Sequence, residues 1–289
     1  MQNIAGINIR LLIESDIPAA MKLKEAAGWN QTENDWRCLL TLEPQGCFAA
    51  TLNDELLGTT TTTTYGEELA WVGMVLVQPE KRRLGIATRL LRTALDYLHQ
   101  KVATVKLDAT MAGKPVYERL GFRVEGLIER WTGISNSKAV ANDHVQSVAT
   151  LDETTVDDLL VLDRRSFGAD RSELLNNLIK SVSVPAALAR AEDGSLIGYS
   201  LSRSGTKAGY VGPIISTDPN QIEALLDRIL GHLSGQRVYI DFNATSQSGS
   251  SLLLDRGFVK ERELVRMALG NSSSTTSRFV FAIAGPEVG

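Results

Sequence analysis

A cluster of positive side chains around one glycine marks the first place in this sequence where we expect chemistry. Lys81, Arg82 and Arg83 precede Gly85, and Arg89 follows it. The flanking residues predict a strand before the cluster and a helix after it. The first backbone N–H groups of a helix lack intrahelical partners and lie at the positive end of the helix dipole. A short basic turn at that position therefore predicts a binding site for an anion such as phosphate.

The two elements that hold this turn follow from their apolar residues. Val72 to Val77 is an apolar run that stops before Pro79, which cannot donate to a sheet ladder, and it predicts a strand. The predicted helix has apolar residues in steps of three and four at Ala87, Leu90, Leu91, Ala94, Leu95 and Leu98. This stripe lays the helix on the sheet and leaves Arg89 and Arg92 on its outer side.

The spacing Arg82-x-x-Gly85-x-Ala87 resembles the acyl-CoA signature of the GNAT acetyltransferases, Q/R-x-x-G-x-G/A. Residues 117–122 (YERLGF) resemble the second signature of that family, and the resemblance covers residues 1–134. It implies that acetyl-CoA binds as co-substrate and that the turn amides hold its pyrophosphate. The implied cofactor-binding residues are Val75, Leu76, Val77, Arg82, Arg83, Leu84, Gly85, Ile86, Ala87, Thr88, Thr110 and Tyr117.

The same resemblance implies roles in transfer of an acetyl group to an amine. Backbone amide around Val75–Val77, where the central strand splays, stabilises the thioester oxygen as it gains charge. Tyr117 matches the general acid of the family, which protonates the leaving thiolate. The alternative for Tyr117 is a core tyrosine that packs beneath Phe122. Thr110 falls where the family usually has an asparagine, so it keeps a hydroxyl group and loses an amide donor.

The motifs leave the general base open. An α-amino acceptor with a pKa near ~7.7 loses its proton at pH 7 for only ~1 kcal/mol, whereas a lysine amine with a pKa near ~10.4 requires ~4.6 kcal/mol. Asp108 lies on the predicted strand beside the cleft, on the same face as Thr110, and is the candidate base. The alternative for Asp108 is a strand-end residue that caps the following loop.

Candidate acceptor-site residues come from both halves of the chain. Trp29 and Trp36 occupy the region that shapes the acceptor site in GNAT proteins, and core packing is the other common use of tryptophan. In the second half, Tyr199 and Asp241 are candidates to face the first half and close the pocket. Strand geometry directs only alternate residues inward, which limits this second pair.

The order of predicted elements in residues 1–134 is strand, two helices, three strands, helix, strand, helix and strand, which is the GNAT order. We therefore expect an α/β (α+β) domain with a mixed, mostly antiparallel twisted sheet flanked by helices. The six consecutive threonines of Thr59–Thr64 suit the β-branched preference of a sheet. The seventh strand of the family is not visible before residue 135, and we expect contact with the second half to supply it.

The same order of elements starts again further on, so the chain contains an internal repeat. Matching tripeptides are Leu57-Gly58-Thr59 with Ile197-Gly198-Tyr199, Asp108-Ala109-Thr110 with Asn243-Ala244-Thr245, and Leu120-Gly121-Phe122 with Arg256-Gly257-Phe258. We expect a catalytic GNAT domain at 1–134, a polar linker at 135–147 and a degenerate GNAT-like domain at 148–289 that acts as lid or acceptor site. The second copy has no basic glycine turn, so acetyl-CoA is expected only in the first. The whole chain resembles bacterial tandem GNAT proteins.

Composition limits the remaining possibilities. The chain has 289 residues, enough for about two domains of ~150 residues. Its net charge of −4 gives no general attraction for nucleic acid. We find no signal sequence and no apolar run of membrane length. The two cysteines and the scattered histidines suggest neither a disulfide framework nor a metal site. Together these features predict a cytoplasmic protein that binds neither membrane nor nucleic acid. We expect it to be a monomer or a homodimer.

These features predict an acetyl-CoA-dependent N-acetyltransferase that moves an acetyl group by direct transfer to the primary amine of a small molecule. One alternative is an acyl-CoA-binding regulator without turnover, against which an intact Tyr117 argues. Another is an acyltransferase for a longer acyl chain, because the residues of the strand Val72–Val77 do not fix the length of the acyl group.

Overall fold

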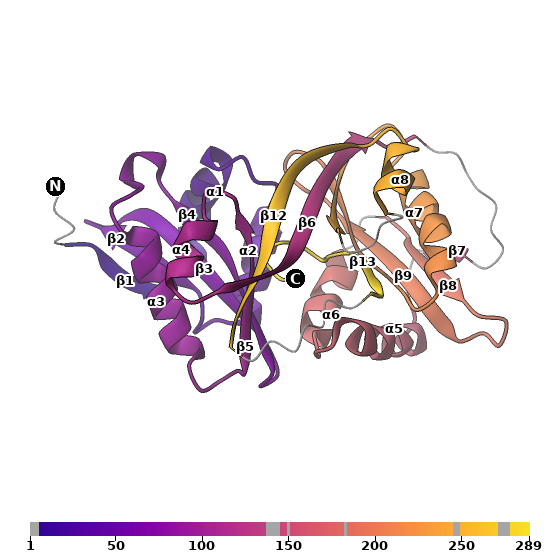
Figure 1. Ribbon diagram of the computed structural model, residues 1–289, viewed down its shortest axis with the longest axis horizontal. Coiled ribbons are helices and arrows are strands. Elements are labelled where there is room, and N and C mark those ends of the chain that lie inside the picture. The colour runs from indigo at the N-terminus through magenta and orange to yellow at the C-terminus, as the bar shows by residue number, and fades with distance from the viewer. Residues whose placement is uncertain (1–5, 137–144, 149–150, 182–183, 245–248, 271–277) are drawn as a thin grey trace.

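The computed structural model describes residues 6–136, 145–148, 151–181, 184–244, 249–270 and 278–289. The strands of these residues form one continuous sheet of 13 strands, in the order β1-β2-β3-β4-β5-β12-β6-β11-β13-β10-β9-β8-β7. Figure 1 shows a half of the molecule on either side of two long strands, β6 (Arg123–Ile134) and β12 (Val259–Gly270), which lie side by side in the middle. The predicted α/β (α+β) class, a mostly antiparallel sheet flanked by helices, is confirmed.

The first half has the predicted order of elements. Its strands are β1 (Asn8–Leu11), β2 (Phe48–Leu52), β3 (Glu55–Tyr65), β4 (Leu69–Val77) and β5 (Thr104–Thr110), followed by β6. Its helices are α1 (Ile17–Ala26), α2 (Glu33–Leu42), α3 (Ile86–Leu98) and α4 (Lys114–Arg119). Helix α2 begins at a reciprocal cap, in which Asp35 N–H donates to Thr32 Oγ1 (3.3 Å) and Thr32 N–H donates to the Asp35 carboxylate (2.6 Å).

The second half repeats this order. Its strands are β7 (Val145–Val148), β8 (Ala186–Arg190), β9 (Leu196–Arg203), β10 (Gly209–Ser216), β11 (Arg237–Asn243), β12 and β13 (Val280–Ala282), and its helices are α5 (Glu153–Phe167), α6 (Ser172–Ser181), α7 (Ile222–Gly231) and α8 (Gly249–Leu254). Strand β7 is a correction, because residues 145–147 were predicted to belong to the linker. They form a strand that pairs antiparallel with β8, although their polar sequence does not have the pattern of a strand. Linker residues 137–144 lie outside the described residues.

The two halves exchange a strand. β12 lies between β5 and β6, with Leu264 opposite Thr110, so the second half supplies the strand that the first half lacks. In return, β6 lies between β12 and β11, with Trp131 opposite Ile240. Residues 123–134 and 259–270 therefore each belong to both halves of the sheet, and the predicted boundary at residue 134 does not divide it.

Two buried ion pairs fasten the exchanged strands. Both carboxylate oxygens of Asp108 on β5 accept from Arg266 on β12, each at 2.8 Å. In the same way, Asp241 on β11 accepts from Arg130 on β6. The side chains of both aspartates are 0% exposed, so each carboxylate depends on its arginine for compensation.

Helices cover both faces of the sheet. Helix α3 packs against one face through Leu90 and Ala94 of the predicted stripe and also through Ile86, and α7 covers the second half. Helices α1, α2, α5 and α6 join in one core that spans both halves. This core includes Ile283 and Val288, from the C-terminal tail that follows β13, and Figure 1 shows the C-terminus in the middle of the molecule.

Candidate active site

The central opening of the first half is the divergence of β4 from β5. These strands pair in parallel only over Leu69–Trp71 and then separate. At the same point β4 carries a β-bulge, because Met74 and Val75 together face Thr60 of β3. Met74 has a φ of 48°, a left-handed conformation that a non-glycine residue adopts at a cost and that clusters at functional sites. The bulge interrupts the ladder at Met74 and Val75, and the Met74 carbonyl oxygen accepts from the side chain of Thr59 at 2.8 Å.

The predicted anion site lies where β4 leads into α3. Gly85 has a φ of 81° directly before the helix, a conformation that favours glycine, and Arg83 is also left-handed at 62°. Arg82 donates from Nε to the Val77 carbonyl oxygen at 3.3 Å, which ties the turn to the end of the strand. In the described part of the chain, no ion pair occupies Arg82, Arg83 or Arg89, and all three side chains are exposed. Free N–H groups and uncompensated cations therefore meet at one helix end, as a pyrophosphate would require.

Tyr117 and Thr110 both line the cavity at the strand divergence. The Tyr117 ring also packs edge-to-face against Phe122, with ring centroids 6.0 Å apart, so the packing and the cavity-lining interpretations hold together. Burial raises the pKa of Tyr117, which keeps the phenol protonated and able to donate at neutral pH. Thr110 Oγ1 accepts from the Gly113 N–H at 3.1 Å.

Two carboxylates line this cavity. Asp108, the predicted base, is there, but both of its oxygens accept from Arg266. Glu287 is the second, and sequence reasoning missed it. Only 4% of Glu287 is exposed, and its carboxylate accepts from Gln31 (2.8 Å) and Arg203 (2.9 Å). Burial raises the pKa of Asp108 and of Glu287, while Arg266 and Arg203 respectively act in the opposite direction.

The C-terminal tail that carries Glu287 is held by backbone contacts to both halves. Trp71 Nε1 donates to the Pro286 carbonyl oxygen at 3.0 Å, and Tyr65 Oη donates to that of Val288 at 2.6 Å. Arg171 of the second half donates to the Gly289 oxygen at 2.8 Å. No motif marks this tail in the sequence; the only signal is a Gly-Pro-Glu turn after the last predicted strand.

A larger cavity of about 330 Å³ lies on the other side of Glu287. It is lined from α2, α6 and β9, and its charged groups include Asp35 and Arg203. Arg203 donates to Asp35 at 3.1 Å as well as to Glu287. A guanidinium in the wall of the larger cavity thus also binds the carboxylate that lines both cavities. Glu287 and Val288 line this cavity too, and the tail therefore separates it from the strand divergence.

The structure brings only one of the four predicted acceptor residues to the cavity at the strand divergence. Trp29 lines it, beside Gln31. Trp36 is 0% exposed within the core, Tyr199 donates to Asp163 in a buried network, and Asp241 is bound by Arg130. These three predictions were wrong, because the position of each residue along its strand or helix directs its side chain into the interior and not into the cavity.

The corresponding opening of the second half is filled. β10 and β11 also pair in parallel and then diverge, but β13 occupies the gap, with Ala282 opposite Ile214 and Phe242. Before α7, Asp218 caps the turn in place of a basic glycine loop, and accepts from the Asn220 N–H at 3.0 Å. Over its described residues, the second half therefore lacks the open divergence and the basic glycine turn of the first.

Within the described ranges, no group of three or more His, Cys, Asp and Glu side chains is arranged to hold a metal ion. Nor does any helix in the described part of the chain have the length and apolar character needed to cross a membrane.

Comparison with known proteins matches both halves of the chain to one family. Residues 14–122 match a model described as the acetyltransferase (GNAT) family, and residues 159–282 match one described as an acetyltransferase (GNAT) domain. An uncharacterized N-acetyltransferase of Bacillus subtilis (strain 168), YitH, is 27% identical over 87% of this chain and 88% of its own length. A holothin acyltransferase of a Pseudoalteromonas species is 26% identical over 91% of this chain and 88% of its own.

Solved structures share the architecture. A crystal structure of a proposed acetyltransferase from Pyrococcus horikoshii covers 100% of this chain and 99% of its own, with a TM-score of 0.84 at 23% identity. A tandem GNAT protein from the clavulanic acid biosynthesis pathway covers 92% and 99%, with a TM-score of 0.64 at 13% identity. At these identities the likeness concerns the fold, and it includes the tandem arrangement.

Proposed function

This chain belongs to the GNAT acetyltransferases and carries two of their domains in tandem, and we propose that its first half is an acetyl-CoA-dependent N-acetyltransferase. The observation that carries the proposal is the strand divergence. Its cavity collects the bulge at Met74, Tyr117 and two buried carboxylates, and a basic glycine turn with free cations follows the same strand. The co-substrate supplies the acetyl thioester when it is bound.

The residues of this chain have separate tasks in direct transfer. The amides of Arg83–Thr88 and the side chains of Arg82 and Arg83 would hold the pyrophosphate. Backbone N–H groups at the bulge would donate to the thioester carbonyl oxygen as it gains charge. Tyr117 holds a proton at Oη that it can give to the leaving sulfur.

The proton of the attacking amine goes to a carboxylate. Both Asp108 and Glu287 have raised pKa values, which makes them better proton acceptors near neutral pH than ordinary carboxylates. Both oxygens of Asp108 accept from the guanidinium of Arg266. Glu287 accepts from a guanidinium through one oxygen only, and its other oxygen accepts from the neutral amide of Gln31. We therefore assign proton acceptance to Glu287 and a supporting role to Asp108. Glu287 also lines the larger cavity.

We infer that the acceptor is the primary amine of a small molecule. The name of the relative that acts on holothin supports a small acceptor and also leaves the acyl group open, because it specifies an acyltransferase. An acyl chain longer than acetyl is therefore the second candidate.

Turnover of a panel of primary amines tests the proposal. Purified protein is mixed with acetyl-CoA or butyryl-CoA and each amine, and thiol release and the acylated product are measured together. We expect acylated product from at least one amine, and a large loss of rate in Tyr117→Phe. Binding of the co-substrate without product from any amine would instead favour a regulator.

A further inference from the structure

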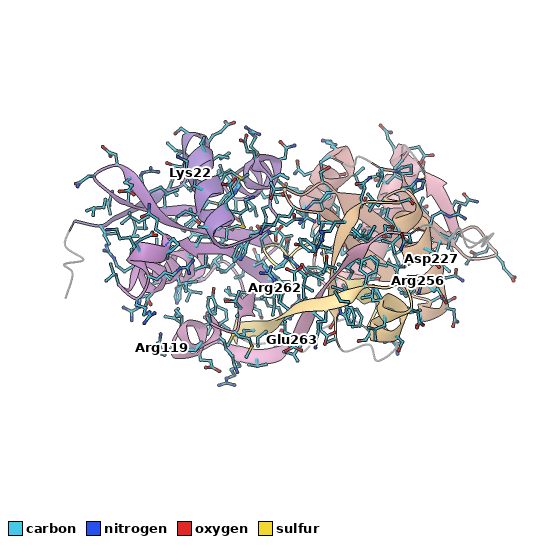
Figure 2. All side chains as sticks on the ribbon, turned by 90° about the horizontal axis from the view of Figure 1, so that it is seen from above. Lys22, Arg119, Asp227, Arg256, Arg262 and Glu263 are labelled. Carbon is cyan, nitrogen blue, oxygen red and sulfur yellow. The ribbon has the colours of Figure 1, made fainter. Side chains whose placement is uncertain are left out.

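One arginine of the exchanged strand faces the active-site cavity. Arg262, Leu264 and Arg266 are alternate residues of β12, so they share one face of the sheet. Arg266 is paired with Asp108, and Leu264 is buried. Arg262 lines the cavity at the strand divergence, and Figure 2 shows it in the middle of the molecule, between the two halves.

Arg262 differs from the other arginines of this region because, among the described residues, no carboxylate forms an ion pair with it. Within the described residues, no hydrogen bond or ion pair reaches its guanidinium, and its Nε is buried without a partner. Asp241 is taken by Arg130, and Glu287 by Arg203. Burial lowers the pKa of Arg262, and the charge of Arg130 acts in the same direction.

An uncompensated cation in a partly buried site is costly, and a ligand that brings the missing negative charge removes the cost. The nearby acids do not reach it: Asp241 and Glu261 act on Arg262 only through space. The cavity therefore lacks one negative charge. Glu287, which already accepts from Arg203 and Gln31, carries the opposite charge and lines the same cavity. A ligand with both a positive and a negative group would match the two.

The chemistry of the missing group follows from the guanidinium and the lining. A guanidinium binds a planar carboxylate through two parallel hydrogen bonds. The phosphates of the co-substrate have their own site at Gly85, which follows the far end of β4. The rest of the lining includes the apolar side chains of Trp29, Met74 and Leu264, which suit a compact ligand.

We propose that the acceptor is an amine that also carries a carboxylate, and that Arg262 binds this carboxylate. The inference rests on the proposed function and names its substrate class. Arg262 sets specificity: it positions the acceptor, whose amine then lies toward Glu287 and the bulge of β4.

Matched amines test the assignment. With acetyl-CoA saturating, kcat/KM is measured for glycine, β-alanine and 4-aminobutyrate, for the carboxamide of each, and for aminomethylphosphonate. We expect at least one carboxylate to exceed its carboxamide by about tenfold or more, as for a hydrogen bond to a charged group. Arg262→Met is expected to remove this preference, by lowering kcat/KM for the carboxylate to the value for its carboxamide. Arg119→Met, at an exposed arginine of α4, keeps the preference.

A binding measurement makes the test independent of turnover. In the presence of CoA, the N-acetylated carboxylates are expected to raise the Tm of the wild type, their carboxamides are not, and Arg262→Met abolishes the difference. The Tm of Arg262→Met without ligand is expected to equal or exceed that of the wild type, because the substitution removes an unpaired charge. A purely structural arginine would instead lower the Tm when it is replaced.

The outcomes separate this inference from the proposed function. Carboxamides used as well as carboxylates would overturn the role of Arg262 while acyl transfer stands. A preference for the phosphonate would overturn the carboxylate and keep an anion site. If no amine is acetylated, the proposed function fails, and a shift in Tm with the N-acetylated carboxylates alone would still support the carboxylate site.

Discussion

Replacing Gly73 by alanine is expected to displace the C-terminal tail from the active site. A Cβ at Gly73 would lie 2.6 Å from the carbonyl oxygen of Glu287 and 2.8 Å from its Cα. Carbon atoms in contact prefer about 3.5–4.0 Å, so the two segments must separate by about 1 Å. Because the obstructing atoms belong to the backbone, no rotamer change of Glu287 relieves the contact.

The size of the effect follows from this displacement. Inserting a methyl group into a filled site typically costs about 1–3 kcal/mol of unfolding free energy. Moving a catalytic group by about 1 Å typically lowers the rate about 100-fold. Gly73 lies on β4, and the turn around Gly85 follows that strand. The alanine at Gly73 leaves this turn unobstructed. We therefore expect kcat/KM for acyl transfer to fall about 100-fold, while the Kd for acetyl-CoA stays within about threefold.

Steady-state rates and calorimetry on the same preparation check this expectation. Gly126→Ala on β6 is the matched control, since a Cβ there meets nothing within 4 Å, and it should change neither activity nor Tm. Wild-type activity in Gly73→Ala would refute the assignment of the tail to the active site. Equal losses of activity and of acetyl-CoA affinity would indicate a general disturbance of the first half.

Three further substitutions test individual groups. Tyr117→Phe should lower kcat by about 10²–10³ with little change in the Kd for acetyl-CoA, because it removes a proton donor. Glu287→Gln should remove the acid limb of the pH profile of kcat/KM. In the wild type that limb lies above the ordinary glutamate pKa of 4.5, because burial raises the pKa and the protonated carboxyl accepts no proton. Arg266→Met should lower the unfolding free energy by about 3–5 kcal/mol, because it leaves Asp108 buried and unpaired.

Each of these has its own control. For Tyr117→Phe, an unchanged kcat would assign the tyrosine to packing alone. Asp35→Asn removes the other carboxylate on Arg203, so it should retain the acid limb. Loss of the limb in both variants would contradict its assignment to Glu287 alone. For Arg266→Met, urea unfolding should show a smaller loss of unfolding free energy at about pH 5 than at about pH 8. The unpaired Asp108 carboxyl has a raised pKa, so it takes up a proton at the lower pH and no longer buries a charge. An equal loss at both pH values would contradict an unpaired Asp108 carboxylate.

Much of the fold followed from local patterns. The apolar stripe of α3 and the β-branched run of β3 predicted their elements, because amphipathic and strand periodicity depend only on neighbouring residues. The exchange of β6 and β12 was not readable in that way. Both strands carry the pattern of a half-buried strand, and pairing partners some 130 residues apart leave no local trace. The expectation that the second half supplies the missing strand came from the family order, and β12 fulfils it.

The site divided in the same manner. The turn around Gly85 is continuous in sequence and was found. Glu287 was missed because it reaches the cavity from a segment that only the tertiary fold brings to β4. Trp36 and Asp241 were misplaced for a related reason, since residue type does not say which side of a helix or strand faces the cavity. Arg262 carries no sequence signal, because its lack of a partner is a property of the folded chain.

Calorimetric titration of acetyl-CoA into the full-length protein tests the central claim most directly. We expect one site per chain, lost in Gly85→Asp, because any side chain at a φ of 81° is strained and a carboxylate repels phosphate. The filled opening between β10 and β11 predicts no second site. Two sites per chain, or a single site that survives Gly85→Asp, would contradict the account.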